Sequence, residues 1–182
     1  MTEGPICKRL ISFALPLMAV NLLQVFYNSA DMMIVGMSAE ADAVGAIGTT
    51  MSMINLIVNS FIGLSVGASV TLAQSIGAGK YERSERIVHT SLVFSLILGI
   101  VACAVGLGIS RPVLTAMGNR GRLLELSIIY SRIYFLGLPF LSVTNFASAL
   151  FRASGDSKSP LIVLGISGLF NVLANIAFIK IF

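Results

Sequence analysis

Long apolar runs, separated by short polar clusters, dominate this chain. Five runs contain no Asp, Glu, Lys or Arg, namely Leu10–Ala30, Ala43–Gly79, Ile87–Ser110, Ile133–Phe151 and Ser159–Ile179. Each has roughly 19 residues or more, which is enough to cross the hydrocarbon core of a bilayer as a helix. A transmembrane strand would need only about 9 to 11 residues with alternating polarity, and these runs do not alternate. The pattern predicts an all-α integral membrane fold with five transmembrane helices, at about residues 10–36, 43–77, 87–110, 123–151 and 160–182.

Two of the runs allow a second interpretation. The run after Ala43 is long enough for two short helices, but it has no proline or polar turn in its middle, which favours one long, tilted helix. The first run follows Lys8 and Arg9 as a signal peptide would, yet it exceeds the usual apolar core of about 7 to 15 residues. We therefore expect it to be a membrane helix.

The composition supports a membrane protein and excludes other classes. Of the 182 residues, 56% are hydrophobic and 11% are charged, against about 25% charged in ordinary soluble domains. The 12 Lys and Arg fall between the apolar runs and form no single basic face, so nucleic acid is not an expected partner. Cys7 and Cys103 lack metal-type spacing and are expected to be plain thiols, with neither a disulfide framework nor a metal site.

The basic residues of short loops indicate the orientation. With the N-terminus inside, the loop of residues 37–42 faces outward and carries acids but no base, while the cytoplasmic side receives Lys8, Arg9, Lys80, Arg83, Arg86, Arg152 and Lys158. Against this stand Arg111, Arg120, Arg122, Arg132 and Lys180, which the same topology places outward. We expect a multi-pass protein of the cell (plasma or inner) membrane with a cytoplasmic N-terminus.

The first run carries polar residues on one side. Asn21, Gln24, Asn28 and Asp31 follow one another at offsets of three, four and three, which places them on one helix face. A charged Asp near the centre of a membrane helix costs about 2.5–3.5 kcal/mol, so Asp31 is a candidate functional residue. The three amides are candidate cavity-lining residues, although hydrogen bonds between helices would explain them equally well. Asp31 would alternatively be an ordinary solvated residue at the outer interface.

The fifth run contains a matching pair of amides. Asn171 and Asn175 are four residues apart on one face, about 17 to 23 Å from Pro160, which brings them to the depth of Asp31. A carboxyl group desolvated among these amides and the Tyr27 hydroxyl would favour its neutral form and so bind and release a proton. The same oxygen-rich cluster would alternatively coordinate Na⁺ at Asp31. The residues leave both coupling ions open.

Two further motifs concern catalysis and bending. Gly63, Ser65 and Gly67 spell the hydrolase string GxSxG, but they lie inside an apolar helix and not at a strand-turn-helix junction. A small-residue packing ridge is the better interpretation, and we expect no enzyme activity. Pro16 and Pro139 lie within predicted helices, where proline removes a backbone donor and tends to kink the helix. A kink at Pro16 would link protonation of Asp31 to the shape of the first helix.

The order and spacing of these landmarks resemble the multidrug and toxic compound extrusion (MATE) family in its NorM/DinF-like form. The similarity spans the whole chain, and its landmarks are Pro16, the segment from Tyr27 to Gly36 with Asp31, the segment from Ala73 to Gly79, the segment from Arg152 to Asp156 with Pro160, and the pair Asn171 and Asn175.

The resemblance implies a cation-coupled antiporter that exports drugs and other organic cations or amphipathic compounds by alternating access. Its twelve helices form two six-helix lobes, of which this chain would supply five helices, without the sixth helix and the C-terminal lobe. In the family, a cation or proton site uses residues that match Tyr27, Asp31, Asn171 and Asn175, and the helix-one bend matches Pro16. The coupling ion would be H⁺ or Na⁺, with no cofactor, and some members carry a second Asp where Asn175 stands.

Two alternatives remain beside the exporter. The lipid-linked oligosaccharide and lipid II flippases share the superfamily fold, but they usually place more basic residues in the cavity. A non-transporting membrane scaffold or a truncated remnant would explain five helices without a second lobe. The expected partners are small amphipathic or cationic molecules, the lipid bilayer and the missing C-terminal lobe.

Overall fold

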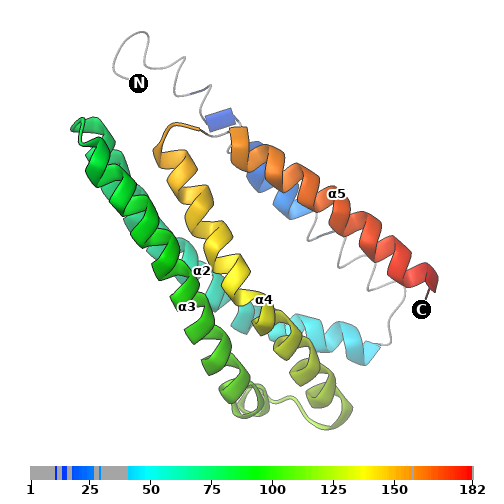
Figure 1. Cartoon of the computed structure of the whole chain (residues 1–182). Coiled ribbons are helices and arrows are strands. Elements are labelled where there is room, and N and C mark those ends of the chain that lie inside the picture. The colour runs from blue at the N-terminus through cyan, green and yellow to red at the C-terminus, as the bar shows by residue number, and fades with distance from the viewer. Residues whose placement is uncertain are drawn as a thin grey trace. The chain divides into compact units, whose positions relative to one another are not determined.

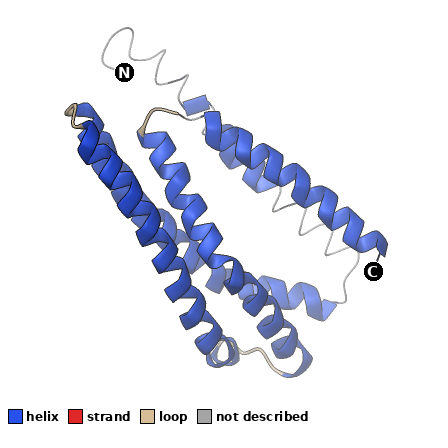
Figure 2. Cartoon of the chain, in the orientation of Figure 1, coloured by secondary structure: helices blue, strands red, loops and turns tan. Residues whose placement is uncertain are grey.

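The computed structural model describes residues 11, 14–15, 18–26, 29, 41–156 and 158–181. Every regular element in these ranges is a helix, and they contain no strand (Figure 2). Residues 18–26 are helical, and four long helices follow: α2 (Ala41–Gly77), α3 (Tyr81–Ala116), α4 (Gly121–Ala153) and α5 (Lys158–Ile181). The chain forms two compact units, one of Ala39–Ser154 and one that combines Met1–Ser38 with Gly155–Phe182.

The helices of the first of these units are longer than a bilayer is thick. α2 is one uninterrupted helix of 37 residues, as predicted, and α3 has 36 residues. At 1.5 Å per residue, α3 is about 54 Å long, whereas the hydrocarbon core measures about 30 Å. α3 therefore extends beyond its apolar run of 87–110 at both ends, because the charged residues that bound the run keep the helical hydrogen-bond pattern.

A tight turn joins α2 to α3 and reverses the chain (Figure 1). Gly79 adopts φ +69°, a conformation that side chains disfavour, and the Lys80 N–H donates to the Ser75 carbonyl at 3.1 Å. Ser84 at the start of α3 donates its hydroxyl hydrogen bond to Ser75 Oγ, 3.1 Å away. Since both serine side chains are buried, this contact ties the two helix ends together.

α4 packs against both α2 and α3, and these two contact each other less extensively. The core cluster consists of Phe61 from α2 with Phe135 and Leu138 from α4. On α3, Gly106 permits the close approach, because a Cβ there would lie 2.8 Å from Cδ2 of Phe135. Small residues thus let the helices pack closely, as is common where lipid supplies no hydrophobic drive between helices.

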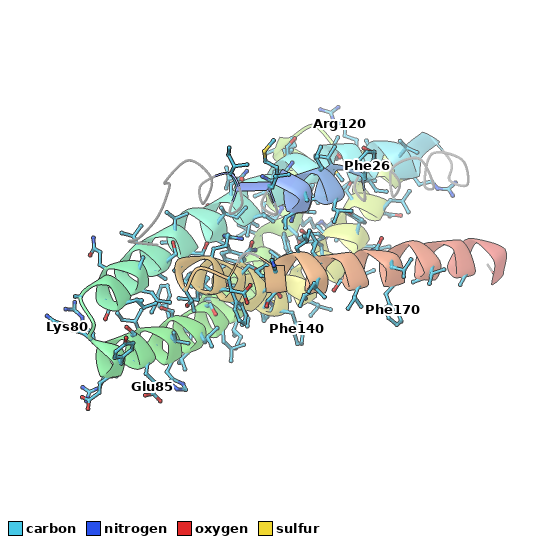
Figure 3. The ribbon with its side chains drawn as sticks, turned by 90° about the horizontal axis from the view of Figure 1, so that it is seen from above. Phe26, Lys80, Glu85, Arg120, Phe140 and Phe170 are labelled. Carbon is cyan, nitrogen blue, oxygen red and sulfur yellow. The ribbon has the colours of Figure 1, made fainter. Side chains whose placement is uncertain are left out.

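The outer surface of this bundle is apolar. α2, α3 and α4 are long and apolar enough to cross a membrane, and at most 28% of the most apolar stretch of each is buried within the structure. Phe140 points away from the bundle with 78% of its surface exposed (Figure 3), and Leu56 is 71% exposed. Apolar surface of this extent requires lipid or further helices around it. The prediction of an all-α membrane fold is confirmed.

Candidate functional site

The described part of the first segment carries two of the predicted amides. Asn21 and Gln24 lie in the helical stretch 18–26 and are exposed. Their three-residue spacing places them on one helix face. Exposed apolar side chains, such as Leu22 and Phe26, occupy other positions of the same stretch.

The remaining predicted residues of the first segment lie outside the described residues, namely Pro16, Tyr27, Asn28 and Asp31. On α5, Asn171 is exposed, and Asn175 belongs to the helix although its side chain is outside the description. The helical stretch 18–26 and α5 fall into the same compact unit. The predicted role of these residues as one cation site therefore stays a prediction.

The exposed amides nevertheless constrain what surrounds them. In hydrocarbon, a polar side chain without a partner is costly, so membrane helices turn such groups toward the protein interior or a water-filled cavity. Asn21 and Gln24 would satisfy this only if further protein or water faces them. Their amide oxygens are hard donors, which suit a proton-bearing carboxyl group or Na⁺. Among the described residues, no group of three or more His, Cys, Asp or Glu is arranged to hold a metal ion.

Asp156 fixes the start of α5 and thereby the register of Asn171. Its Oδ1 accepts the backbone N–H groups of Lys158 and Ser159, each at 3.0 Å, and its Oδ2 accepts the Ser159 hydroxyl. This is the pattern of a helix N-cap. The Ser159 hydroxyl and backbone bonds hold the pKa of Asp156 below its ordinary value. The motif from Arg152 to Asp156, noted in the sequence, thus contains a helix cap.

Asn119 is a buried polar residue that the sequence reasoning missed. It lies between α3 and α4 with 2% of its surface exposed, and its Nδ2 donates to Thr49 Oγ1 and Ser127 Oγ, each at 3.3 Å. Its backbone N–H donates to the Leu114 carbonyl at 3.2 Å. Asn119 therefore joins α2, α3 and α4 at one end of the bundle. The available signal was its position between the turn glycines Gly118 and Gly121.

The GxSxG string does not form a nucleophile site. Ser65 is 1% exposed in the middle of α2, and its hydroxyl donates to the Ile62 carbonyl of the same helix at 2.7 Å. His89 lies on the exposed surface of α3, where its Nε2 is 4.0 Å from Glu85 Oε1. A serine nucleophile needs an accessible hydroxyl with a base in hydrogen-bond reach, and Ser65 has neither feature.

The sequence resembles known proteins over most of its length. The family model described as MatE matches residues 16–177. The chain is 32% identical over 160 residues to the probable multidrug resistance protein YoeA of Bacillus subtilis, which covers 88% of the chain and 35% of the relative. It is 27% identical to the probable multidrug resistance protein NorM of Thermotoga maritima, over 94% of the chain and 37% of the relative.

Solved structures show the same fold. A MOP superfamily transporter from Pyrococcus furiosus, whose description suggests a different function from a reversed polarity of its binding pocket, matches with a TM-score of 0.88 and 26% identity. An outward-facing multidrug resistance MATE transporter of the same superfamily matches with the same TM-score and identity. Each match covers 94% of this chain and 38% of the solved chain. The chain thus spans well under half the length of the proteins it resembles.

Proposed function

Because the chain belongs to the MatE family, we propose that it forms the N-terminal part of an exporter of amphipathic or cationic small molecules, driven by H⁺ or Na⁺. Members of this family are transporters and not enzymes. The family match over residues 16–177 carries the proposal, since it includes the polar first segment and the Asn pair of α5. A C-terminal lobe would complete the substrate cavity, because the chain spans only 35% of its relative YoeA.

Asp31 is the proposed ion-exchanging group. Tyr27, Asn171 and Asn175 would surround its carboxyl group, and Asn21, Gln24 and Asn28 would line the adjoining cavity. Two observations support this arrangement: the exposed amides Asn21 and Gln24 share a helix face, and α5 lies in the same compact unit as their helix. Exposed amides in a membrane helix call for a polar space in front of them.

The proposed mechanism is alternating access. One lobe rocks against the other while Asp31 exchanges H⁺ or Na⁺ against the exported compound. A potential of 100 mV is worth about 2.3 kcal/mol per charge moved, which is comparable to the cost of about 2.5–3.5 kcal/mol for a charged Asp at the helix centre. Pro16 would let the first helix bend as Asp31 changes its charge. The N-terminus would be cytoplasmic, because Lys80, Arg83 and Arg86 then lie inside.

The test is efflux from proteoliposomes that contain the complete transporter, with a proton or sodium gradient imposed separately. We expect Asp31→Asn to insert normally and to lose gradient-driven efflux under the coupling ion. Asp42→Asn, which alters an acid outside the apolar runs, should leave efflux unchanged. Unchanged efflux by Asp31→Asn would remove Asp31 from the mechanism, and a loss under only one gradient would identify the ion.

A further inference from the structure

A groove of about 330 Å³ lies between α2 and α3 next to the turn that joins them. α2 contributes Gly67, Ala68 and Thr71, and α3 contributes Arg83, Arg86, Ile87, Thr90 and Ser91. The groove forms because these two helices contact each other less than each contacts α4. Small side chains at positions 67 and 68 of α2 leave the space open.

The end of this groove near the turn is basic. Among the described residues, neither Arg83 nor Arg86 has a carboxylate oxygen within 4.0 Å, although Glu82 and Glu85 lie on the same helix. Figure 3 shows Lys80 and Glu85 at the turn end of the two helices. Glu82 and Glu85 line a neighbouring surface hollow together with Arg86, His89 and Thr90, and neither acid lines the groove itself. Arg83 therefore borders the groove alone, whereas Arg86 stands between the groove and the acids.

Hydroxyl groups lie one to two turns deeper in the groove. Among the described residues, the side-chain hydroxyls of Thr90 and Ser91 make no hydrogen bond, so both are able to donate. Thr71 donates to the Gly67 carbonyl at 2.9 Å, which leaves its oxygen as an acceptor. Two guanidinium groups with two free hydroxyl donors form a set suited to phosphate oxygens.

The other end of the groove is apolar. Leu64 on α2 and Phe94 on α3 continue the helix faces that line it, because they stand three or four residues from Gly67 and Ser91. Both are about half exposed, at 47% and 49%. The surface therefore runs from guanidinium groups through hydroxyls to apolar side chains over about three helical turns, in the same order as the parts of a phospholipid.

The depth of Arg83 and Arg86 in the membrane agrees with a phospholipid whose headgroup lies at the basic end of the groove. The apolar run of α3 begins at Ile87, and Arg83 and Arg86 precede it by at most four residues, or about 6 Å along the helix. With 87–110 in the hydrocarbon core, both guanidinium groups stand at the level of the lipid headgroups. Cationic pockets between membrane helices are known binding places for anionic headgroups.

We propose that the groove between α2 and α3 binds an anionic phospholipid, with Arg83 and Arg86 on its phosphate, Thr90 and Ser91 donating to its headgroup oxygens, and Leu64 and Phe94 against an acyl chain. The occupant is a lipid and not a free anion, because the basic end continues into exposed apolar surface. The site is independent of the transport cycle proposed above, since none of its residues belongs to the proposed ion site.

The test measures the lipid that the full-length protein retains from nanodiscs of equal parts phosphatidylglycerol and phosphatidylcholine, by native mass spectrometry. Each basic side chain near an anionic surface is worth about a fivefold change in affinity, so Arg83→Gln with Arg86→Gln should lower phosphatidylglycerol retention roughly thirtyfold. The charge-matched control is Arg111→Gln, near the other end of α3, with Arg120→Gln, just before α4, and it should retain the lipid as the unaltered protein does. Equal losses from both pairs would overturn the proposal.

A second variant tests the groove without a change of charge. Gly67→Leu places a large side chain in the groove and should also reduce retention. The fold should accept this substitution, because a Cβ at Gly67 meets no atom within 4 Å. Gly108→Leu, at an equally open position on α3, should not reduce retention. Soluble glycerol phosphate should fail to displace phosphatidylglycerol at equal concentration. Displacement at equal concentration, or undiminished retention by Gly67→Leu, would contradict a lipid site.

Discussion

Gly99 of α3 lies directly against the backbone of Pro139 of α4. A Cβ placed on Gly99 would stand 2.5 Å from the Pro139 Cα and 3.0 Å from the Leu138 carbonyl oxygen. Backbone atoms cannot swing aside as a long side chain can. The two helices therefore touch here because one residue has no side chain and the other interrupts the hydrogen-bond ladder of α4.

Gly99→Ala should separate α3 from α4 and destabilise the bundle. Overpacking of a close contact costs about 1–3 kcal/mol, more than the gain in helix propensity from glycine to alanine. The free energy of unfolding in mixed micelles, from a titration with denaturing detergent, measures this loss. Gly108→Ala is the control, because a Cβ there meets no atom within 4 Å, and it should be neutral or slightly stabilising. Equal effects of both substitutions would contradict the close contact.

The Asn119 side chain is expected to contribute to stability through its contacts with two helices. Asn119→Ala removes the hydrogen bonds to Thr49 and Ser127 and leaves a small cavity, so the free energy of unfolding should fall by about 1–3 kcal/mol. Asn145→Ala is the matched control, because the Asn145 Nδ2 donates only to the Leu141 carbonyl of its own helix. The same detergent titration compares the two variants, and a smaller loss for Asn119→Ala than for Asn145→Ala would argue against this role.

Replacing Ser142 should not lower the stability of the fold, in contrast to the replacements of Gly99 and Asn119. Its hydroxyl oxygen is buried, and within the described residues it has no hydrogen-bond partner. Since an unsatisfied buried polar group costs about 1–3 kcal/mol, Ser142→Ala should leave stability unchanged or raise it by about 1 kcal/mol. Ser131, equally buried on α4, donates to the Ile128 carbonyl at 3.1 Å, so Ser131→Ala should not stabilise. A clear loss of stability in Ser142→Ala alone would reveal a partner for its hydroxyl.

The long helices were predictable from the sequence because lipid imposes a simple rule. An apolar run of spanning length has few structural options in a bilayer, and α2 follows its run almost residue for residue. α3 differs, since it continues from Tyr81 to Ala116 beyond the run of 87–110. The apolar run marks the part of the chain that suits hydrocarbon. The helix itself ends at Ala116, because the turn at Gly118 satisfies its last carbonyl groups.

The interior of the bundle was not predictable in the same way. Ser95, Ser110 and Ser127 are completely buried, and each donates its hydroxyl to a carbonyl of its own helix three or four residues earlier. A serine with this bond is small and satisfied, so hydropathy does not reveal which serines face a neighbouring helix. For the candidate ion site, the sequence names Asp31 and its neighbours, and the described residues add the exposed positions of Asn21, Gln24 and Asn171.

The Asp156 cap makes the start of α5 sensitive to pH. Hydrogen bonds from Ser159 lower the pKa of this carboxyl group in the folded state. Because the pKa is lower in the folded state, the ionised carboxyl group stabilises the helix start at pH values above the unfolded pKa of about 3.9. This stabilisation disappears as the pH falls through the lower, folded pKa. At pH 7, Asp156→Ala should therefore speed hydrogen exchange of the amides in the first turn of α5.

The charge and the hydrogen bonds of Asp156 are separable by substitution. Asp156→Asn keeps an oxygen that accepts the N–H groups of Lys158 and Ser159. The first-turn amides of α5 should therefore exchange in this variant at a rate between the rates in the unaltered protein and in Asp156→Ala. Below the folded pKa, the unaltered protein should resemble Asp156→Asn, because the protonated carboxyl group no longer favours the positive end of the helix dipole. Exchange in the first turn of α4 serves as the internal control. If Asp156→Ala leaves exchange in α5 unchanged at pH 7, another group caps this helix.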